Sequence, residues 1–207
     1  MTAKPRVPRT RLQPEERRSQ LLACAIAAFA EHGVARATHS HVAERAGVSV
    51  SAVHSYFRTR DDLVSATLGE VEAYLDGIVA DTLGSIVPVF DALMALADRF
   101  ASDAREKPDM IKVWLDWSTG VGTETWPRYL DVLDRLHDAT QKIFARGKRQ
   151  KLFPDALNTK AAARIYIGGG HTVALMQFAG ASRNDVDKLV DQLVRGVMCI
   201  GLDAPVR

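Results

Sequence analysis

The sequence lacks the features that mark several large classes of protein. Its 207 residues hold only two cysteines, Cys24 and Cys199, too few for a disulfide framework or a cysteine-based zinc site. We expect buried thiols there, with a redox role as the alternative. No apolar run approaches the roughly 20 residues that cross a bilayer, and the basic amino terminus lacks the apolar segment of a secretory signal. These absences predict a soluble, cytoplasmic protein.

Catalytic motifs are also missing. The sequence contains no GxSxG elbow, P-loop, dinucleotide fingerprint or CxxC pair, and Gly120 with Gly122 is too short a pattern to bind phosphate. His39 and His41 are two residues apart, which places them roughly 200° apart on a helix, so they cannot readily share a metal ion. We therefore expect no cofactor, no metal site and no enzymatic activity.

Aromatic residues are scarce at 7%, and alternating runs of β-branched residues are few, whereas 47% hydrophobic content is ample for a core. This composition favours an all-α fold. Apolar spacing, Gly and Pro breaks and capping residues predict helices over residues 14–32, 59–83, 89–104, 109–118, 127–147, 159–178 and 183–200, besides two short helices within 38–63.

Charge is divided unevenly along the chain. Residues 1–60 contain ten Lys or Arg and four Asp or Glu, a balance of +6, whereas the other 147 residues contain 17 and 21, a balance of −4. A basic amino-terminal part joined to a mildly acidic remainder indicates that the first third meets a polyanion. We divide the chain into a basic arm at 1–12, a DNA-binding domain at 13–60 and a helical body at 61–207.

The stretch at 38–63, THSHVAERAGVSVSAVHSYFRTRDDL, organises the chain. It predicts two short helices separated at Gly47, a residue that readily takes the left-handed conformation ending a helix, with Ser49 as the N-cap of the second. Their apolar faces can be buried only against each other and a third helix, which Pro14–His32 supplies. The pattern is that of a helix-turn-helix whose second helix enters a DNA groove.

Other segments suggest supporting roles. The arm at 1–12 is typical of a segment that follows phosphates or the minor groove, or of a solubilising tail. The long helix at 59–83 would act as a lever between body and DNA unit. The basic run at 146–151 reads as a solvated loop, or else a second nucleic-acid contact. Gly168, Gly169 and Gly170 indicate close helix approach at a subunit interface, or a kink or pocket wall.

The residues AERAGVSVSAVHSYFRTRDDL, within 21–64, resemble the TetR family of transcriptional regulators. The arm VPRTRL, the body stretch KVWLDWS and the following Glu124 to Pro127 motif are similar to the HapR/SmcR group of quorum-sensing master regulators in that family. The resemblance implies an Ω-shaped homodimer of about nine helices per subunit, joined through the last two helices and bound to a pseudo-palindromic operator.

The resemblance also implies which residues contact DNA. Arg9 and Arg11 match arm residues that read the minor groove. His54 and Ser55 stand where the family or the group usually has Tyr and Asn, so we expect a related rather than identical operator. The expected contacts are Arg9, Arg11, Arg17, Thr38, Ser49, Ser51, Ala52, His54, Ser55, Tyr56 and Arg60.

In the body, the resemblance implies a pocket for a small, mostly hydrophobic ligand. A stripe of aromatic residues at helical spacing can equally be ordinary core, and that alternative stays open. The competing function is a helical protein-interaction module without DNA binding, which leaves the basic arm unexplained. The expected pocket residues are Leu75, Ile78, Val79, Ile111, Trp114, Leu115, Tyr129, Leu133, His137, Tyr166 and Gly170.

Overall fold

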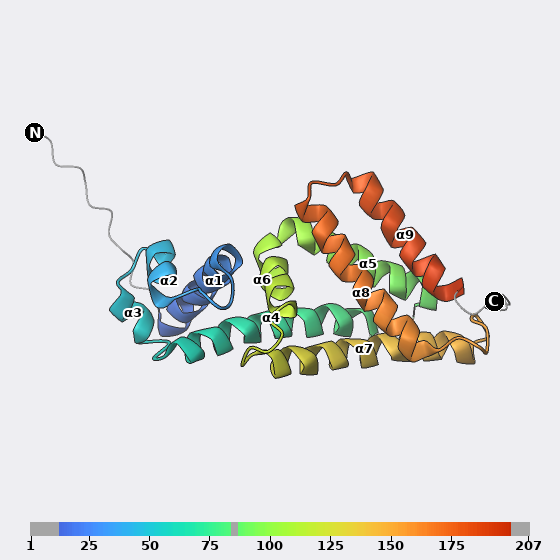
Figure 1. Ribbon diagram of the computed structural model, residues 1–207, viewed down its shortest axis with the longest axis horizontal. Coiled ribbons are helices and arrows are strands. Elements are labelled where there is room, and N and C mark those ends of the chain that lie inside the picture. Colours follow the sequence, from blue (N-terminus) through green and yellow to red (C-terminus); the bar gives the residue numbers. More distant parts are fainter. Residues whose placement is uncertain (1–12, 84–86, 200–207) are drawn as a thin grey trace, which may run out of the picture. The chain divides into compact units, whose positions relative to one another are not determined.

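A computed structural model describes residues 13–83 and 87–199, and in these ranges all regular secondary structure is α-helical (Figure 1). The predicted all-α, TetR-like fold class is confirmed. No helix in the described ranges is both long and apolar enough to cross a membrane. The helices are α1 (Pro14–His32), α2 (His39–Ala46), α3 (Val50–His54), α4 (Arg60–Leu83), α5 (Val89–Glu106), α6 (Pro108–Ser118), α7 (Trp126–Arg149), α8 (Thr159–Phe178) and α9 (Arg183–Cys199).

The chain forms two compact units, Met1–Thr67 and Leu68–Arg207, which we call the head and the body. The division falls within α4, so the first turns of this helix belong to the head and the remainder to the body. The predicted boundary after residue 60 lies at the start of the same helix.

The head is built around α1, the predicted support helix. Gln13 and Glu16 form a capping box in which the backbone N–H of Gln13 donates to Glu16 Oε2 at 2.9 Å. Such reciprocal bonds satisfy N–H groups that a helix start leaves free. The apolar stripe of α1 is buried through Leu21, Ala25 and Phe29. This face buries the apolar side chains of α2 and α3, which are too short to bury them against each other alone.

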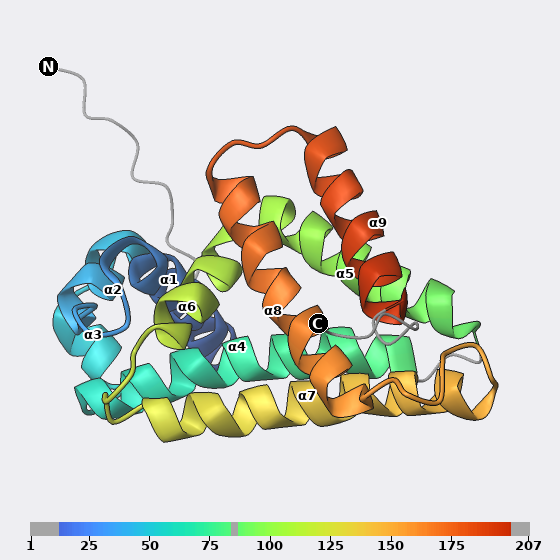
Figure 2. The ribbon, with the colours of Figure 1, turned by 45° about the vertical axis from the view of Figure 1, so that its right-hand side comes forward.

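The body core lies where α5, α8 and α9 meet. Ala101 of α5, Val173 of α8 and Val186 with Val190 of α9 form one buried cluster. Figures 1 and 2 show α8 and α9 as a hairpin with α5 alongside them. The apolar stripe of α9 is therefore buried inside the protomer.

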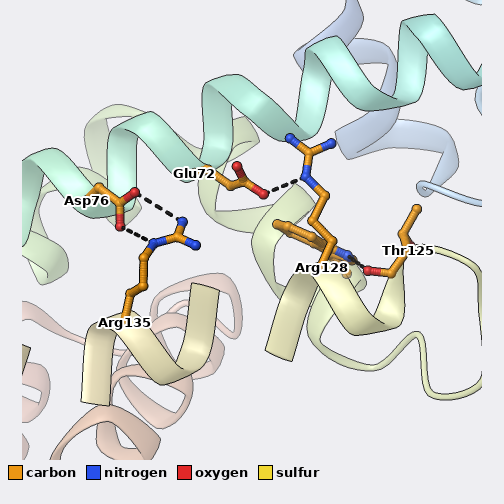
Figure 3. Close-up of polar contacts among 6 residues, drawn as sticks. Glu72, Asp76, Thr125, Arg128 and Arg135 are labelled. Carbon is orange, nitrogen blue, oxygen red and sulfur yellow. Dashed lines mark hydrogen bonds and ion pairs between the residues drawn. The ribbon is translucent and has the colours of Figure 1, made fainter. Parts of the chain in front are cut away.

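The helices α4 and α7 run side by side within the body. Arg128 Nε lies 2.5 Å from Glu72 Oε1, and Arg135 Nη2 lies 3.1 Å from Asp76 Oδ2 (Figure 3). The two pairs follow both helices in the same direction, so α4 and α7 are parallel. The start of α7 is also fixed, because Trp117 Nε1 donates to the carbonyl of Thr125 at 3.0 Å.

One local prediction is wrong. The basic run at 146–151 was expected to be a loop, but α7 continues to Arg149. Gly147 does not end the helix. A Cβ at this position would collide with the ring of Phe153, so Gly147 instead lets the chain after α7 fold back onto the helix.

Candidate DNA-binding surface and body cavity

The turn between α2 and α3 has the predicted geometry. Thr38 caps α2 by accepting from the N–H of His41, and Gly47 ends the helix with φ 64° and ψ 36°. Ser49 then caps α3, its hydroxyl accepting from the N–H of Ala52 at 3.2 Å. A side chain at Gly47 would be strained by the positive φ. The local sequence thus determines the angle at which α3 leaves the turn.

The helix α3 has one buried and one exposed face. Val53 points into the head core and is fully buried. Val50, Ser51, His54 and Ser55 are all exposed, and helical spacing places Ser51 and Ser55 opposite Val53, with Val50 and His54 along one flank of the exposed face. A helix-turn-helix presents this face of its second helix to the major groove. Of the other residues expected here, Ala52 and Tyr56 are half-buried at the edge of the face.

The two serines on this face already use their hydroxyls. Ser55 Oγ donates to the carbonyl of Ala52 at 2.7 Å, within α3 itself. Ser51 Oγ shares a hydrogen bond with Ser49 Oγ at 2.9 Å. Both serines can still accept a hydrogen bond. Their side chains are nevertheless committed to shaping the start and end of α3.

The histidines of the head form two stacked pairs. His39 and His54 lie with ring centroids 3.9 Å apart and planes inclined by 12°, and His32 and His41 lie at the same centroid distance. His39 and His41 therefore point to different partners, as their spacing predicts. Among the described side chains, no three His, Cys, Asp or Glu gather as ligands for a metal ion.

Arg60 has a structural role that the sequence did not predict. Its guanidinium donates to the carbonyls of Val34 at 2.6 Å, Ala35 at 2.7 Å and Ala37 at 3.2 Å. These bonds tie the loop after α1 to the start of α4. These bonds use three of the five N–H donors of the guanidinium, and the expected DNA contact of Arg60 stays a prediction.

Of the remaining arginines expected to contact DNA, Arg17 is the one within the described residues. Arg17 is half-buried on α1, and its Nη1 donates to Gln20 Oε1 at 2.6 Å. Arg9 and Arg11 lie outside the described residues, so their minor-groove role stays a prediction.

The body contains an apolar cavity of about 60 Å³. Every helix of the body contributes to its wall, and no charged side chain lines it. Six of the residues expected from the resemblance take part, and the lining is Leu75, Ile78, Val79, Leu96, Ala97, Phe100, Trp114, Leu136, Tyr166, Ile167, Gly170, Val173 and Leu193.

The other five expected pocket residues do not line this cavity; they are Ile111, Leu115, Tyr129, Leu133 and His137. Sequence reasoning missed Leu96, Ala97 and Phe100 because α5 carries no motif of the resemblance. On α7 it selected Leu133, whereas Leu136, about one turn later, lines the cavity.

One polar group in the cavity wall has no partner. Tyr166 donates its hydroxyl to the carbonyl of Leu93 at 2.5 Å, whereas Trp114 Nε1 is buried with no hydrogen-bond partner. His171 stacks against the ring of Trp114 at 4.1 Å between centroids, and its Nε2 lies 3.4 Å from the hydroxyl of Tyr129. Burial lowers the pKa of His171, so the neutral imidazole is favoured there.

The three glycines of α8 have three different environments. A Cβ at Gly169 would collide with the side chain of Leu193, so this glycine permits close contact with α9 inside one protomer. A Cβ at Gly170 would lie 3.7 Å from the ring of Phe100 in the cavity wall, an ordinary contact. Gly168 faces open space. The close approach inferred from the sequence thus occurs within the body.

A basic helix-turn-helix unit attached to an all-helical body defines a DNA-binding transcriptional regulator and not an enzyme. Residues 21–67 match the family described as "Bacterial regulatory proteins, tetR family". The chain thus carries the DNA-binding domain of the TetR family of transcriptional regulators. This match argues against the alternative of a helical interaction module without DNA binding.

Known relatives extend the likeness beyond the head. The chain is 26% identical over 193 residues to the HTH-type transcriptional regulator LuxR of Vibrio harveyi, covering 93% of this chain and 94% of that protein. The fatty acid degradation regulator FadR from Bacillus halodurans has a similar structure, with a TM-score of 0.75, 19% identity, and coverage of 95% and 100%. FadR from Bacillus subtilis in complex with stearoyl-CoA gives a TM-score of 0.72, 16% identity, and coverage of 89% and 99%. These structures establish the fold of the whole chain.

Proposed function

We propose that this regulator binds a pseudo-palindromic operator as a homodimer, that it acts in quorum sensing, and that a small hydrophobic ligand modulates it. The exposed face of α3 is the observation that carries the DNA-binding part. The quorum-sensing part is supported by the VPRTRL and KVWLDWS motifs and by a likeness to the Vibrio harveyi regulator that spans 94% of that protein.

Selection from a random pool of DNA duplexes tests the operator. A two-fold symmetric dimer should enrich two inverted half-sites about one helical turn apart, because each protomer supplies one α3 to the major groove. Enrichment of a single unrepeated half-site would contradict the dimeric operator. Failure to enrich any sequence would contradict DNA recognition itself.

The salt dependence of binding tests the expected phosphate and minor-groove contacts. Arg9→Ala, Arg11→Ala and Arg17→Ala should each flatten the slope of log K against log [salt], by about 0.9 for each phosphate that the arginine neutralises in the parent complex. Arg183→Ala is a matched control, because Arg183 is an exposed arginine at the start of α9 in the body. An unchanged slope in the three variants would exclude these arginines as phosphate ligands.

The dimer surface is expected on α8. Ile165, Gly168 and Leu175 are exposed at helical spacing along one side of the helix, and Leu175 is 61% exposed. Such apolar exposure favours burial against a second copy. Leu175→Arg should shift the sedimentation coefficient toward a monomer at micromolar concentration. Val121→Arg, at a position 73% exposed in a loop, is the control and should leave the assembly unchanged. A monomeric parent protein would overturn the proposal.

The cavity suits a ligand that is neutral, mostly apolar and carries one hydrogen-bond acceptor. Its lining is uncharged, and Trp114 Nε1 is a buried donor without a partner. At about 60 Å³, the cavity is smaller than the ~300 Å³ at which typical ligand sites begin, so side chains must move to admit more than a few heavy atoms. Trp114→Phe keeps an aromatic ring at this position and removes the donor. It should weaken carbonyl-bearing ligands and leave matched hydrocarbons unaffected in calorimetry.

A further inference from the structure

His54 combines exposure with a fixed position. Exposed side chains usually sample several rotamers, and ordering them on binding costs free energy. The imidazole of His54 is held in the absence of DNA by two contacts that differ in kind. Its ring stacks on the buried His39, and its Nδ1 lies 3.2 Å from the carbonyl oxygen of Arg58. The direction of the outer edge of the ring is therefore set before DNA arrives.

The hydrogen bond to Arg58 also determines the tautomer. A carbonyl oxygen can only accept, so Nδ1 must carry the hydrogen and donate it. In the neutral ring, Nε2 is then a hydrogen-bond acceptor. Nε2 has no hydrogen-bond partner among the described residues. The ring thus offers one uncommitted acceptor.

His39 is itself fixed in the same way. Its Nε2 lies 2.8 Å from the carbonyl oxygen of Phe57, to which it donates, and the side chain is only 7% exposed. The carbonyls of Phe57 and Arg58, adjacent in the turn after α3, therefore each hold one ring of the stack. His39 acts on DNA only through His54, so its part is that of a positioning residue.

The neighbours of His54 on the exposed face do not offer an equivalent group. Val50 is apolar, and the hydroxyls of Ser51 and Ser55 are engaged with Ser49 and with the helix backbone. The serine oxygens can still accept, but Nε2 of His54 is the acceptor on this face that belongs to a ring held by both a stack and a hydrogen bond.

We infer that His54 is the base-reading residue of α3, and that its Nε2 accepts a hydrogen bond from an exocyclic amino group in the major groove. Cytosine N4 and adenine N6 are the donors that the major groove displays, whereas guanine and thymine offer acceptors there. The operator should thus carry C or A at one position in each half-site. The inference rests on the proposed operator binding and adds the residue that sets base preference.

The test is selection of duplexes at pH 8. The parent protein should prefer C or A over G or T at the position read by His54, by roughly tenfold, the ratio for one hydrogen bond worth about 1.4 kcal/mol. His54→Phe retains a ring that can stack on His39 but has no acceptor. It should lose the preference at that single position while keeping the rest of the motif.

Three further variants separate a base-reading role from a structural role. Ser55→Ala removes a neighbouring polar group of the same face and should leave the selected bases unchanged. His39→Leu removes the stack and should weaken the preference at the His54 position alone, and His39→Phe, which restores a stacking ring, should recover it. A structural role for His39 would instead lower binding to all sequences equally.

The outcomes distinguish this inference from the proposed function. A parent motif that is unchanged in His54→Phe would overturn the reading role while leaving operator binding intact. A preference for G or T at the affected position would overturn the acceptor assignment. Should Ser55→Ala change the selected base and His54→Phe not, the base-reading role would pass to Ser55. Absence of any selected motif in the parent would refute the proposed operator binding itself.

Discussion

The short helices of the head and the long helix α4 within the body are each held in place by a different kind of polar contact. In the head, side chains bond mainly to backbone groups: Arg60 to three carbonyls, His39 to Phe57, and Thr38 and Ser49 to helix N–H groups. In the body, α4 is fastened to its neighbours by contacts between side chains. Short helices leave a large share of their backbone groups unpaired, so a small unit gains most by satisfying those groups.

The difference has a consequence for function. Backbone ties set the path of the chain and therefore the placement of α3, and they change little when surface residues change. Contacts between side chains hold two helices at one register, and an alternative register can be reached by exchanging partners. The body is thus the part in which a ligand could alter helix positions. Substitutions in each unit test this difference.

Arg60→Met should be the most damaging single change in the head. It removes the donors from three carbonyls and keeps most of the apolar stem, so the destabilisation comes from hydrogen bonding. Because the site is partly exposed, we expect the free energy of unfolding to fall by roughly 3 kcal/mol rather than by the full sum for charged donors. Hydrogen exchange should show faster opening of α1 and α2 with body helices unchanged. An equal increase of hydrogen exchange in the head and in the body would contradict the proposed difference between the two units.

Gly169→Ala should destabilise the body through packing alone. Both Gly169→Ala and the control Gly77→Ala gain up to about 1 kcal/mol of helix propensity, but only the first forces Leu193 to move. We expect the two variants to differ by about 2 kcal/mol in denaturant unfolding, the typical cost of overpacking. A difference near zero would mean that Leu193 turns into the cavity without cost.

Asp103 makes the body sensitive to acid. Its burial would raise the pKa, but hydrogen bonds from Arg99 and Tyr74 and the charge of Lys107 hold the pKa below the ordinary value. Since the pKa is lower in the folded state, this carboxylate stabilises the body above about pH 4 and the contribution disappears as pH falls further. Asp103→Asn should cost about 1.5 kcal/mol at pH 7.

The dependence of stability on pH in the acid range provides the control for the role of Asp103. The melting temperature of Asp103→Asn should fall less steeply below about pH 4 than that of the parent, since the group that titrates has been removed. Identical acid limbs would assign the sensitivity to other carboxylates.

The two ion pairs between α4 and α7 should have the smallest effects. Asp76 and Arg135 are each 47% exposed, so a double-mutant cycle should give a coupling of at most about 0.5 kcal/mol. Glu72 and Arg128 are 21% and 32% exposed, and their coupling should be larger, near ~1 kcal/mol. Raising salt to about 1 M should reduce the first coupling more than the second. A larger loss of coupling at high salt for Glu72 with Arg128 would show that solvent exposure does not determine the strength of these ion pairs.

Local signals predicted the fold well. Gly47, Ser49 and Thr59 mark helix ends in the sequence and act as caps in the structure, because capping depends on one or two neighbouring residues. At Gly147 the same local rule wrongly predicts the end of a helix. A glycine is needed there because Phe153 packs against it when the chain folds back, and helix propensity cannot reveal that contact.

Interactions between distant residues were the ones that sequence reasoning missed. Arg60 lies 26 residues from Val34, and a basic residue beside a DNA-binding motif is indistinguishable in sequence from a phosphate contact. The stacking of His39 on His54 was also invisible. In the body, a stripe of apolar residues predicts burial but not which buried side chains border an empty space. The contribution of α5 to the cavity was therefore missed, and Leu133 was chosen in place of Leu136.

The distribution of tryptophan gives the two units different optical properties. Trp114, Trp117 and Trp126 are the only tryptophans of the chain, and all lie in the body around α6 and the start of α7. Intrinsic tryptophan fluorescence therefore reports on the body alone. Unfolding of the head would be silent in that signal but visible in far-ultraviolet circular dichroism. An emission change on adding a compound would in turn localise its effect to the body, with the cavity-lining Trp114 as the nearest reporter.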